Sequence, residues 1–117
     1  MIPVYADPDR LRQVFINILD NAIKYSAPGG RITVKLWAGE YKAFVEIIDQ
    51  GRGIPPEDLP YLFDRYYRAR QDSGRSGTGL GLSITKAILQ QHGFAFGVNS
   101  AVGQGSTFWF EMADTRA

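Results

Sequence analysis

Cysteine is absent from the 117-residue sequence, which excludes disulfide bonds and thiolate metal sites and suits a reducing compartment. An excess of charge of one sign is absent too, because 13 basic side chains against 12 acidic ones leave a formal net charge of +1. Net charge therefore gives no reason to expect nucleic acid or an anionic membrane as a partner. No apolar run approaches the roughly 20 residues that span a bilayer, and the N-terminus lacks a signal-peptide pattern. We expect a soluble chain, which can be a piece of something larger.

The chain contains enough apolar residues to form one hydrophobic core. Hydrophobic residues make up 44% of the sequence and aromatic residues 13%, which is typical of a folded globular chain. A length of 117 residues suits one domain and is too short for two. We therefore expect a single domain over residues 1–117, without internal repeats.

Hydrophobic periodicity predicts how that domain is built. Asp7 followed by Pro8 is typical of a helix N-cap and a first helical position, and apolar residues then recur at helical spacing to about Tyr25. The expected order is a helix over 8–25, a hairpin from Ile32 to Asp49 that turns at Gly39-Glu40, a short helix from Pro55, a loop over 64–79, a helix from Gly81 to about His92-Gly93, and strands over 94–99 and 106–112. This order predicts an α+β fold, a two-layer sandwich in which a mixed, mostly antiparallel sheet packs on about three helices.

Two asparagines and a lysine share one stripe of the first predicted helix. Asn17, Asn21 and Lys24 stand at i, i+4 and i+7, beside the apolar face. Asparagine is a poor helix former, so two of them on consecutive turns call for a reason beyond an ordinary solvated flank, which is the alternative. Carboxamide oxygens are ligands that Mg²⁺ accepts together with waters and phosphates, and an ammonium group can neutralise a phosphate. The stripe therefore indicates a polyphosphate with its metal.

A carboxylate followed by spaced glycines ends the first hairpin. Asp49, Gly51 and Gly53 lie in the segment D-Q-G-R-G-I-P, and a plain turn would explain them equally well. In the functional interpretation, a carboxylate at a strand end accepts a hydrogen bond from an exocyclic amine such as that of adenine. The glycines would let a flat ring approach the backbone. On this interpretation the carboxylate selects the base.

A glycine-rich turn opens the second long helix. Residues 76–82, S-G-T-G-L-G-L, would offer free backbone N–H groups and the positive end of a helix dipole to a phosphate. The glycine spacing fits neither the dinucleotide fingerprint nor the P-loop, because Leu82 and Leu80 stand where those motifs need glycine and lysine. Four arginines precede the turn, and at least one could clamp a phosphate, although solubility alone would explain them. They are Arg65, Arg68, Arg70 and Arg75.

Two further features have simple explanations. Residues 103–108, G-Q-G-S-T-F, are most simply a hairpin turn, to which Thr107 can add a hydroxyl group for a site. His92, the only histidine, precedes Gly93 without an obvious acidic or nucleophilic companion. We interpret His92 as a helix-terminus residue and not as a catalyst.

Taken together and in this order, the motifs resemble the catalytic, ATP-binding domain of sensor histidine kinases of two-component systems. N-I-L-D-N-A-I-K-Y-S over 17–26 resembles the N box, D-Q-G-R-G-I-P the G1 box, L-F-D-R-Y-Y-R over 62–68 the F box, S-G-T-G-L-G-L the G2 box, and G-Q-G-S-T-F the closing glycine motif. The resemblance covers the chain from Asp7 to about Met112. It implies the Bergerat ATP-binding fold, in which the nucleotide lies between the helices and a flexible lid, here about 64–80.

The resemblance also implies roles for individual residues. Asn21 would hold Mg²⁺, Asn17 would assist the metal or the phosphates, and Asp49 would bind the adenine amine. Asn17, Lys24 and Arg68 are the residues expected to act in catalysis, with Arg68 as the lid arginine at the γ-phosphate. The remaining expected nucleotide contacts are Lys24, Tyr25, Gly51, Gly53, Ile54, Gly77, Thr78, Gly79, Leu80, Gly81, Leu82 and Thr107.

Asn17 separates two classes of function within this fold. The related gyrase, mismatch-repair and chaperone ATPases have a glutamate at the matching position that activates water, whereas a carboxamide cannot accept a proton at neutral pH. We therefore expect transfer of the γ-phosphoryl group to a histidine on a separate dimerisation and phosphoacceptor domain, which we expect to lie outside this sequence. A nonenzymatic nucleotide-binding or partner-docking module is the alternative, and a Bergerat-fold ATPase is a third.

Partners and location follow from the same resemblance. ATP and Mg²⁺ would be the cofactors, the kinase's own acceptor domain the direct partner, and a response regulator an indirect partner. Because dimerisation belongs to the other domain, we expect this chain to be a monomer. It would be a cytoplasmic domain of a parent protein that can be anchored in the bacterial inner membrane.

Overall fold

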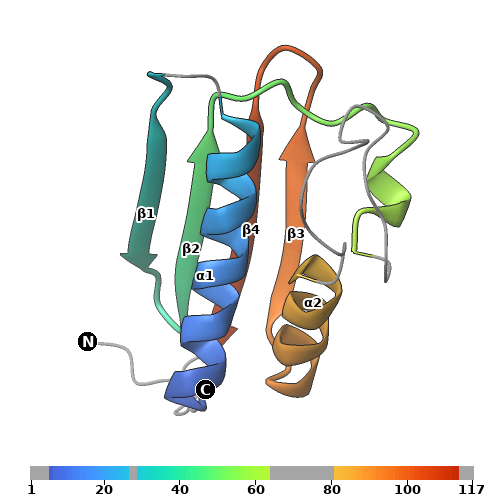
Figure 1. Cartoon of the computed structure of the whole chain (residues 1–117). Helices are drawn as coiled ribbons and strands as arrows, with labels where there is room; N and C mark the ends of the chain where they lie inside the picture. Colours follow the sequence, from blue (N-terminus) through green and yellow to red (C-terminus); the bar gives the residue numbers. More distant parts are fainter. Residues whose placement is uncertain (1–5, 27–28, 64–80, 114–117) are drawn as a thin grey trace.

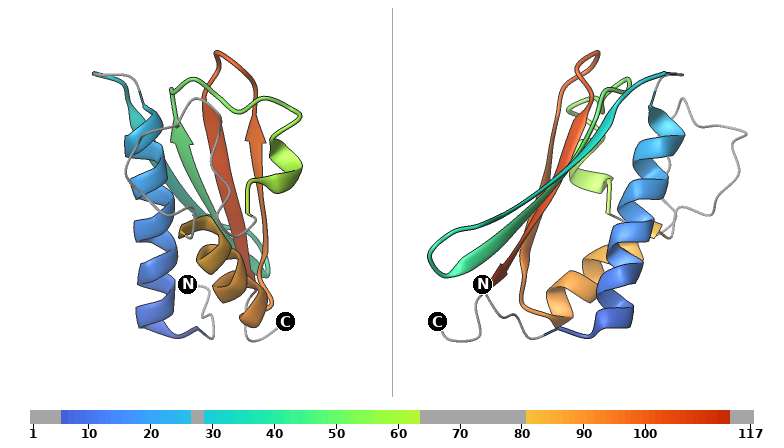
Figure 2. Two further views of the ribbon diagram at one scale, coloured as in Figure 1. Left: turned by 45° about the vertical axis from the view of Figure 1, so that its right-hand side comes forward. Right: turned by 90° about the vertical axis from the view of Figure 1, so that its left-hand side faces the viewer.

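Two helices cover one face of a four-stranded sheet in the computed structural model, which describes residues 6–26, 29–63 and 81–113 (Figure 1). The elements are α1 (Pro8–Tyr25), β1 (Ile32–Ala38), β2 (Lys42–Asp49), the 3-10 helix η1 (Leu59–Tyr61), α2 (Gly81–Gln91), β3 (Ala95–Ser100) and β4 (Ser106–Ala113). Figure 2 shows the two layers from the side, with both helices on the same side of the sheet. The predicted two-layer α+β sandwich is confirmed.

Helix α1 begins where Asp7 caps it. The Asp7 carboxylate accepts hydrogen bonds from the backbone N–H groups of Asp9 at 2.9 Å and Arg10 at 3.3 Å. First-turn N–H groups have no partner within a helix, so this cap stabilises the start of α1. Toward the sheet the helix then buries one residue per turn: Val14, Ile18 and Ala22.

The start of α1 is tied to the end of α2 through His92. The Asp7 backbone N–H donates to Nε2 of His92 at 3.1 Å, and Nδ1 of His92 lies 2.8 Å from the carbonyl oxygen of Ile88. Because Nε2 accepts a hydrogen bond, Nδ1 carries the proton and donates to Ile88. The imidazole also lies against the ring of Phe94, with 5.3 Å between centroids. His92, which directly follows the last residue of α2 as expected, therefore also links the two helices.

The strands follow the order β1-β2-β4-β3. We expected a mixed, mostly antiparallel sheet; every strand pair among the described residues is antiparallel. Side chains alternate between the two faces of each strand. In β4 the side chains toward the helices are Ser106, Phe108, Phe110 and Met112, all buried. Thr107, Trp109 and Glu111 lie on the opposite face, which we call the outer face.

The core lies between the helices and the inner face of the sheet. Val14, Ile47 and Phe110 are at most 1% exposed. Phe15 of α1 packs edge-on against Phe110, with ring centroids 5.5 Å apart. Edge-to-face aromatic pairs of this kind add to the free energy of burial. None of the helices in the described ranges has the length and hydropathy of a membrane span.

The predicted short helix after Pro55 is a single 3-10 turn. The Tyr61 N–H donates to the carbonyl oxygen of Asp58 at 3.1 Å, and that of Leu62 donates to Leu59 at 3.3 Å. Pro60, in the middle of the turn, has no N–H to donate, which discourages a longer helix. Phe63, directly after it, packs edge-on against Phe96 with centroids 5.3 Å apart. The predicted loop over 64–79 lies outside the described residues.

Candidate functional site

Asn17 joins the middle of α1 to the first residue of α2. Its Nδ2 donates to the carbonyl oxygen of Gly81 at 3.1 Å and to Oγ1 of Thr85 at 3.3 Å, while its Oδ1 accepts from Nε2 of Gln13 at 2.9 Å. The Thr85 hydroxyl donates in turn to the Gly81 carbonyl oxygen at 2.9 Å. Thr85 is only 1% exposed, so the two hydrogen bonds of its hydroxyl group are partly shielded from water, whereas the bonds of Asn17 to Gln13 and Gly81 are exposed. Asn17 therefore sets the distance between α1 and the beginning of α2.

Asn21 and Lys24 continue the same side of α1. Asn21 is half-buried one turn after Asn17, and Lys24 is exposed in the last turn. Within the described residues no three His, Cys, Asp or Glu side chains gather as a metal site. Mg²⁺ does not need such a group, because it commonly takes one or two protein oxygens and fills its other positions with phosphates and waters. The Asn21 carboxamide oxygen fits that requirement, and the Asn17 oxygen keeps a second lone pair besides the one that Gln13 uses.

Asp49 is a buried carboxylate at the end of β2. It is 4% exposed, and its Oδ1 accepts a hydrogen bond from the backbone N–H of Gly51 at 2.9 Å. A buried carboxylate is costly without hydrogen-bond donors, so this bond both stabilises the charge and folds the chain into a turn. Strand alternation points Asp49 toward the helix layer, together with Val45 and Ile47.

Gly53 is required by a neighbouring turn. Its φ is 78°, and a Cβ atom there would overlap the carbonyl oxygen of Ala101. Two hydrogen bonds hold the segments together: the Gly103 N–H donates to the Arg52 carbonyl oxygen at 2.7 Å, and the Ile54 N–H donates to Ser100 Oγ at 2.8 Å. We expected Gly53 to make room for the adenine ring; in the structure its missing side chain makes room for the β3–β4 turn.

Ser106 is the residue of β4 whose hydroxyl group lies on the same face of the sheet as Asp49. Ser106 is the cross-strand partner of Asp49, is 7% exposed, and lies 2.8 Å from Ser100, oxygen to oxygen. Thr107, which we expected at the adenine end, lies on the outer face, because successive residues of a strand point to opposite faces. Gly105 precedes them with φ of 78°, and a Cβ there would overlap the backbone oxygen of Asp49.

The remaining predicted site residues divide into two groups. Ile54 and Leu82 are half-buried and pack against the core, and Gly81 is the first residue of α2. Of Tyr25 the structure describes the backbone, as the last residue of α1. The others lie outside the described residues: Arg68, Gly77, Thr78, Gly79 and Leu80.

Ser106, Thr85 and Gln13 were not predicted as site residues. Ser106 has a signal in the sequence, because counting back by twos from the apolar residues Met112, Phe110 and Phe108 reaches position 106. Thr85 and Gln13 have none, since their contacts depend on how two helices distant in the chain pack.

A two-layer sandwich with a buried aspartate at a strand end and the carboxamide of Asn17 at the start of a second helix is typical of a Bergerat-type ATP-binding domain. The sequence profile described as "Histidine kinase-, DNA gyrase B-, and HSP90-like ATPase" matches residues 6–116, and the chain belongs to this family.

Sequence relatives are sensor kinases. The chain is 49% identical over 110 residues to the adaptive-response sensory kinase SasA of Synechococcus elongatus, covering 93% of this chain and 28% of that protein. It is 43% identical over 108 residues to the sensor protein SrrB of Staphylococcus aureus, covering 91% of this chain and 18% of SrrB. The chain therefore spans less than a third of these relatives.

The solved structures that the chain resembles are also histidine kinases. The mycobacterial sensor histidine kinase MprB superposes with a TM-score of 0.83 at 35% identity, covering 95% of this chain and 74% of that chain. Full-length ShkA in complex with AMPPNP superposes with a TM-score of 0.83 at 30% identity, covering 98% of this chain and 24% of ShkA. The predicted resemblance to the ATP-binding catalytic domain of histidine kinases is confirmed, as is the fold class.

Proposed function

We propose that this single domain binds Mg·ATP and donates the γ-phosphoryl group to a histidine on a separate dimerisation and phosphoacceptor domain. The observation that carries the proposal is Asp49, a carboxylate 4% exposed at a strand end and aimed at the helix layer. Its Oδ1 is engaged with the Gly51 N–H. A carboxylate pinned in this way is an oriented acceptor for the exocyclic amine of adenine. The hydroxyl group of Ser106, the cross-strand partner of Asp49, would support the same end of the base.

The phosphates would lie toward the start of α2. Helix N-termini favour anions, and Asn17 holds this one against α1 through the Gly81 carbonyl oxygen. Asn21 would supply an oxygen to Mg²⁺, and Lys24 would neutralise phosphate charge; the metal would contribute neutralisation of the triphosphate. Arg68 at the γ-phosphate, the glycine loop over 77–82 and a lid over about 64–80 remain proposals that rest on the motifs.

The chemistry at the γ-phosphate favours transfer over hydrolysis. The side chain at position 17 is a carboxamide whose Nδ2 donates to Gly81 and Thr85, and a carboxamide has no basic site that could take a proton from water. Positioning and charge stabilisation suffice for phosphoryl transfer to a nucleophile that another domain presents. A phosphorus–nitrogen bond to the acceptor imidazole would form as the bond to the ADP oxygen breaks. A response regulator would then receive the phosphoryl group from the histidine.

The wider setting is part of the proposal. The chain spans 28% of SasA and 18% of SrrB, so the acceptor domain would lie in the rest of a longer protein. Since dimerisation would belong to that domain, the chain by itself would be a monomer. The use of ATP would place this domain in the cytoplasm.

Calorimetry with the ATP analogue AMPPNP, with and without Mg²⁺, tests nucleotide binding. We expect Asp49→Asn to weaken binding at least about tenfold, because an amide can present its NH₂ group to the adenine amine, and hydrogen bonds to charged groups contribute about 1.5–3 kcal/mol. Asp20→Asn, an exposed aspartate on α1, is the matched control and should bind like the parent sequence. Equal affinity of the Asp49 variant would refute the adenine assignment.

Transfer is tested separately with radiolabelled ATP and the parent protein's acceptor domain produced as a second chain. We expect label on the acceptor histidine and negligible ATP turnover without it. Nucleotide binding without labelling would favour the nonenzymatic module, and steady hydrolysis by the chain alone would favour an ATPase.

A further inference from the structure

The outer face of the sheet carries aromatic side chains that the nucleotide site does not use. Trp37 of β1 and Phe44 of β2 are cross-strand partners, and their rings stack with centroids 5.3 Å apart and 15° between planes. Trp109 of β4 lies on the same face, diagonal to Phe44 across the β2–β4 pair. Trp37 is 44% exposed. Exposed aromatic surface of this kind commonly marks a place of interaction.

Two glycines allow these rings to lie close to the sheet. Gly97 is the cross-strand partner of Trp109, and a Cβ atom at Gly97 would lie 2.7 Å from Cζ2 of the indole. A Cβ at Gly39 would lie 2.9 Å from Cε2 of Phe44. Both distances are too short for a real contact, so any larger residue at either position would displace a ring. The positions of the Trp109 and Phe44 rings therefore depend on Gly97 and Gly39.

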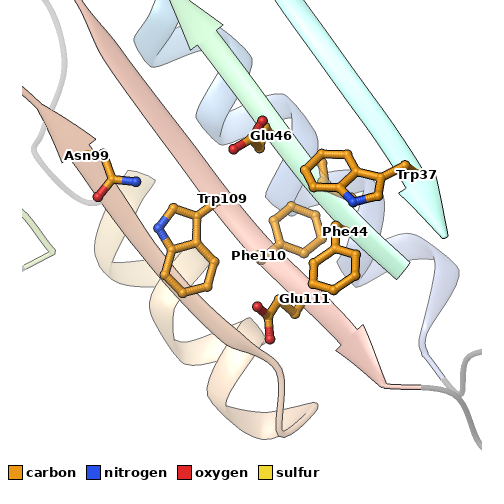
Figure 3. A pocket seen from close by; sticks show the side chains of 8 residues that line it. Trp37, Phe44, Glu46, Asn99, Trp109, Phe110 and Glu111 are labelled. Carbon is orange, nitrogen blue, oxygen red and sulfur yellow. The ribbon is translucent and has the colours of Figure 1, made fainter. Parts of the chain in front are cut away.

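Carboxylates occupy the two remaining corners between the rings. Glu46 is the cross-strand partner of Trp109, and Glu111 is the partner of Phe44, so aromatic and acidic side chains alternate around a gap over β2 and β4. Figure 3 shows Trp109 on one side of this gap, Phe44 and Trp37 on the other, and the two glutamates at its ends. Glu111 forms an ion pair with Lys42 at 3.1 Å. Lys35 of β1 is the other cross-strand partner of Glu46, but the ion pairs among the described residues do not include Glu46.

The gap is an open hollow of about 240 Å³. Pockets for drug-sized ligands and cofactors are generally about 300–1,000 Å³ and enclose most of the ligand. A hollow of this size suits one side chain that enters from a second surface.

We propose that this outer-face pocket, formed by Trp37, Phe44, Trp109, Glu46 and Glu111, binds an arginine side chain on the surface of a partner protein. A planar guanidinium group can stack against an indole or a phenyl ring and at the same time donate hydrogen bonds to a carboxylate. Glu46 supplies that carboxylate. Phosphate-bearing ligands are disfavoured by the two glutamates, and a purely apolar ligand would cover Glu46 without offering its carboxylate a hydrogen bond. The proposal is independent of the nucleotide site, which lies on the other face of the sheet.

The two tryptophans of the chain, Trp37 and Trp109, both line this pocket, which makes the proposal directly measurable. The probe is the peptide acetyl-Gly-Arg-Gly-amide, titrated while the two indole N–H signals are followed by NMR and the tryptophan fluorescence is recorded. The neutral control peptide replaces arginine with citrulline, which keeps the shape and removes the charge. We expect saturable shifts of both indole signals with the arginine peptide and at least about tenfold weaker binding of the citrulline peptide.

Matched variants assign the effect to the pocket. Glu46→Gln should weaken arginine binding about tenfold and leave AMPPNP binding unchanged, because it removes the charge of the carboxylate without changing its shape. Glu57→Gln, at an exposed glutamate that does not line the pocket, should bind the peptide like the parent sequence.

Three results would overturn the proposal. Equal binding of the arginine and citrulline peptides would show that charge plays no part, and equal binding of a lysine peptide would refute the choice of guanidinium. Indole shifts that follow protein concentration without peptide would assign the pocket to contacts between copies of the chain.

Discussion

Replacing Thr85 with valine tests whether the polar link between α1 and α2 stabilises the domain. Valine keeps the branched shape and similar helix propensity of threonine, so the change removes a hydroxyl with little effect on packing. That hydroxyl donates to the Gly81 carbonyl oxygen and accepts from Asn17 Nδ2. With about 1 kcal/mol for each net hydrogen bond, the free energy of unfolding should fall by about 1–2 kcal/mol.

The loss of stability that we expect from Asn17→Ala is smaller than the three hydrogen bonds of Asn17 suggest. Asn17→Ala loses its bonds to Gly81, Thr85 and Gln13. Alanine recovers up to about 0.7 kcal/mol through its higher helix propensity. Because the Asn17 side chain is partly exposed, water can also replace it as a partner of the groups that lose a hydrogen bond. We expect a net loss of about 1 kcal/mol.

Urea denaturation followed by circular dichroism, without nucleotide, measures both changes and the double variant. The two substitutions remove one shared hydrogen bond, so the double variant should be more stable than the sum predicts, with a coupling of about 0.5–1.5 kcal/mol. Additivity within about 0.3 kcal/mol would refute the link, because independent sites behave in that way. Omitting nucleotide separates this effect from any loss of ATP contacts at Asn17.

Three further predictions concern the turns and the site. Gly105→Ala should lower the free energy of unfolding by at least about 3 kcal/mol in urea denaturation, because backbone strain at positive φ and overlap of the new Cβ with the backbone add. Gly103→Ala, with φ of 81° and open space around its Cβ, should cost only about 1–2 kcal/mol, and equal losses would contradict the close approach at Gly105. Ser106→Ala should weaken AMPPNP binding about threefold to tenfold in calorimetry while Thr107→Ala leaves it unchanged, because only Ser106 lies on the face of Asp49; the reverse order would restore Thr107. His92→Phe should lower the melting temperature by about 4–8 °C through loss of the acceptor for the Asp7 N–H, an effect of about 1 kcal/mol, and an unchanged melting temperature would show that water replaces it.

Local patterns in the sequence account for the elements and for part of the site. Asp7 and Pro8 predict the start of α1 at the residue where it begins, since capping depends on neighbours in the chain. The alternation that predicts the last strand also gives the buried face of β4. Asp49 could be singled out because a carboxylate that ends an apolar strand conflicts with burial unless it has a partner or a ligand.

Contacts between distant segments could not be predicted in the same way. That Gly53 leaves room for a ligand ring stays a prediction, but its sequence context gives no sign that the β3–β4 turn, about fifty residues away in the chain, lies against it. The closing motif suggests Thr107 for the site, but the residue on the face of Asp49 is Ser106, because the face of a sheet that a side chain occupies depends on its position in the alternation of the strand.

The sequence by itself determined where the two long helices and the four strands lie, because these depend on spacing along the chain, and its motifs indicated the family by resemblance. Asp49, Asn17 and Asn21 stay the proposed polar residues of the site. Only the tertiary structure decided that Asn17 and Thr85 join α1 to α2, that Ser106 faces Asp49, and which residues form the outer-face pocket. These contacts come from strand register and helix packing, which bring together residues far apart in the chain.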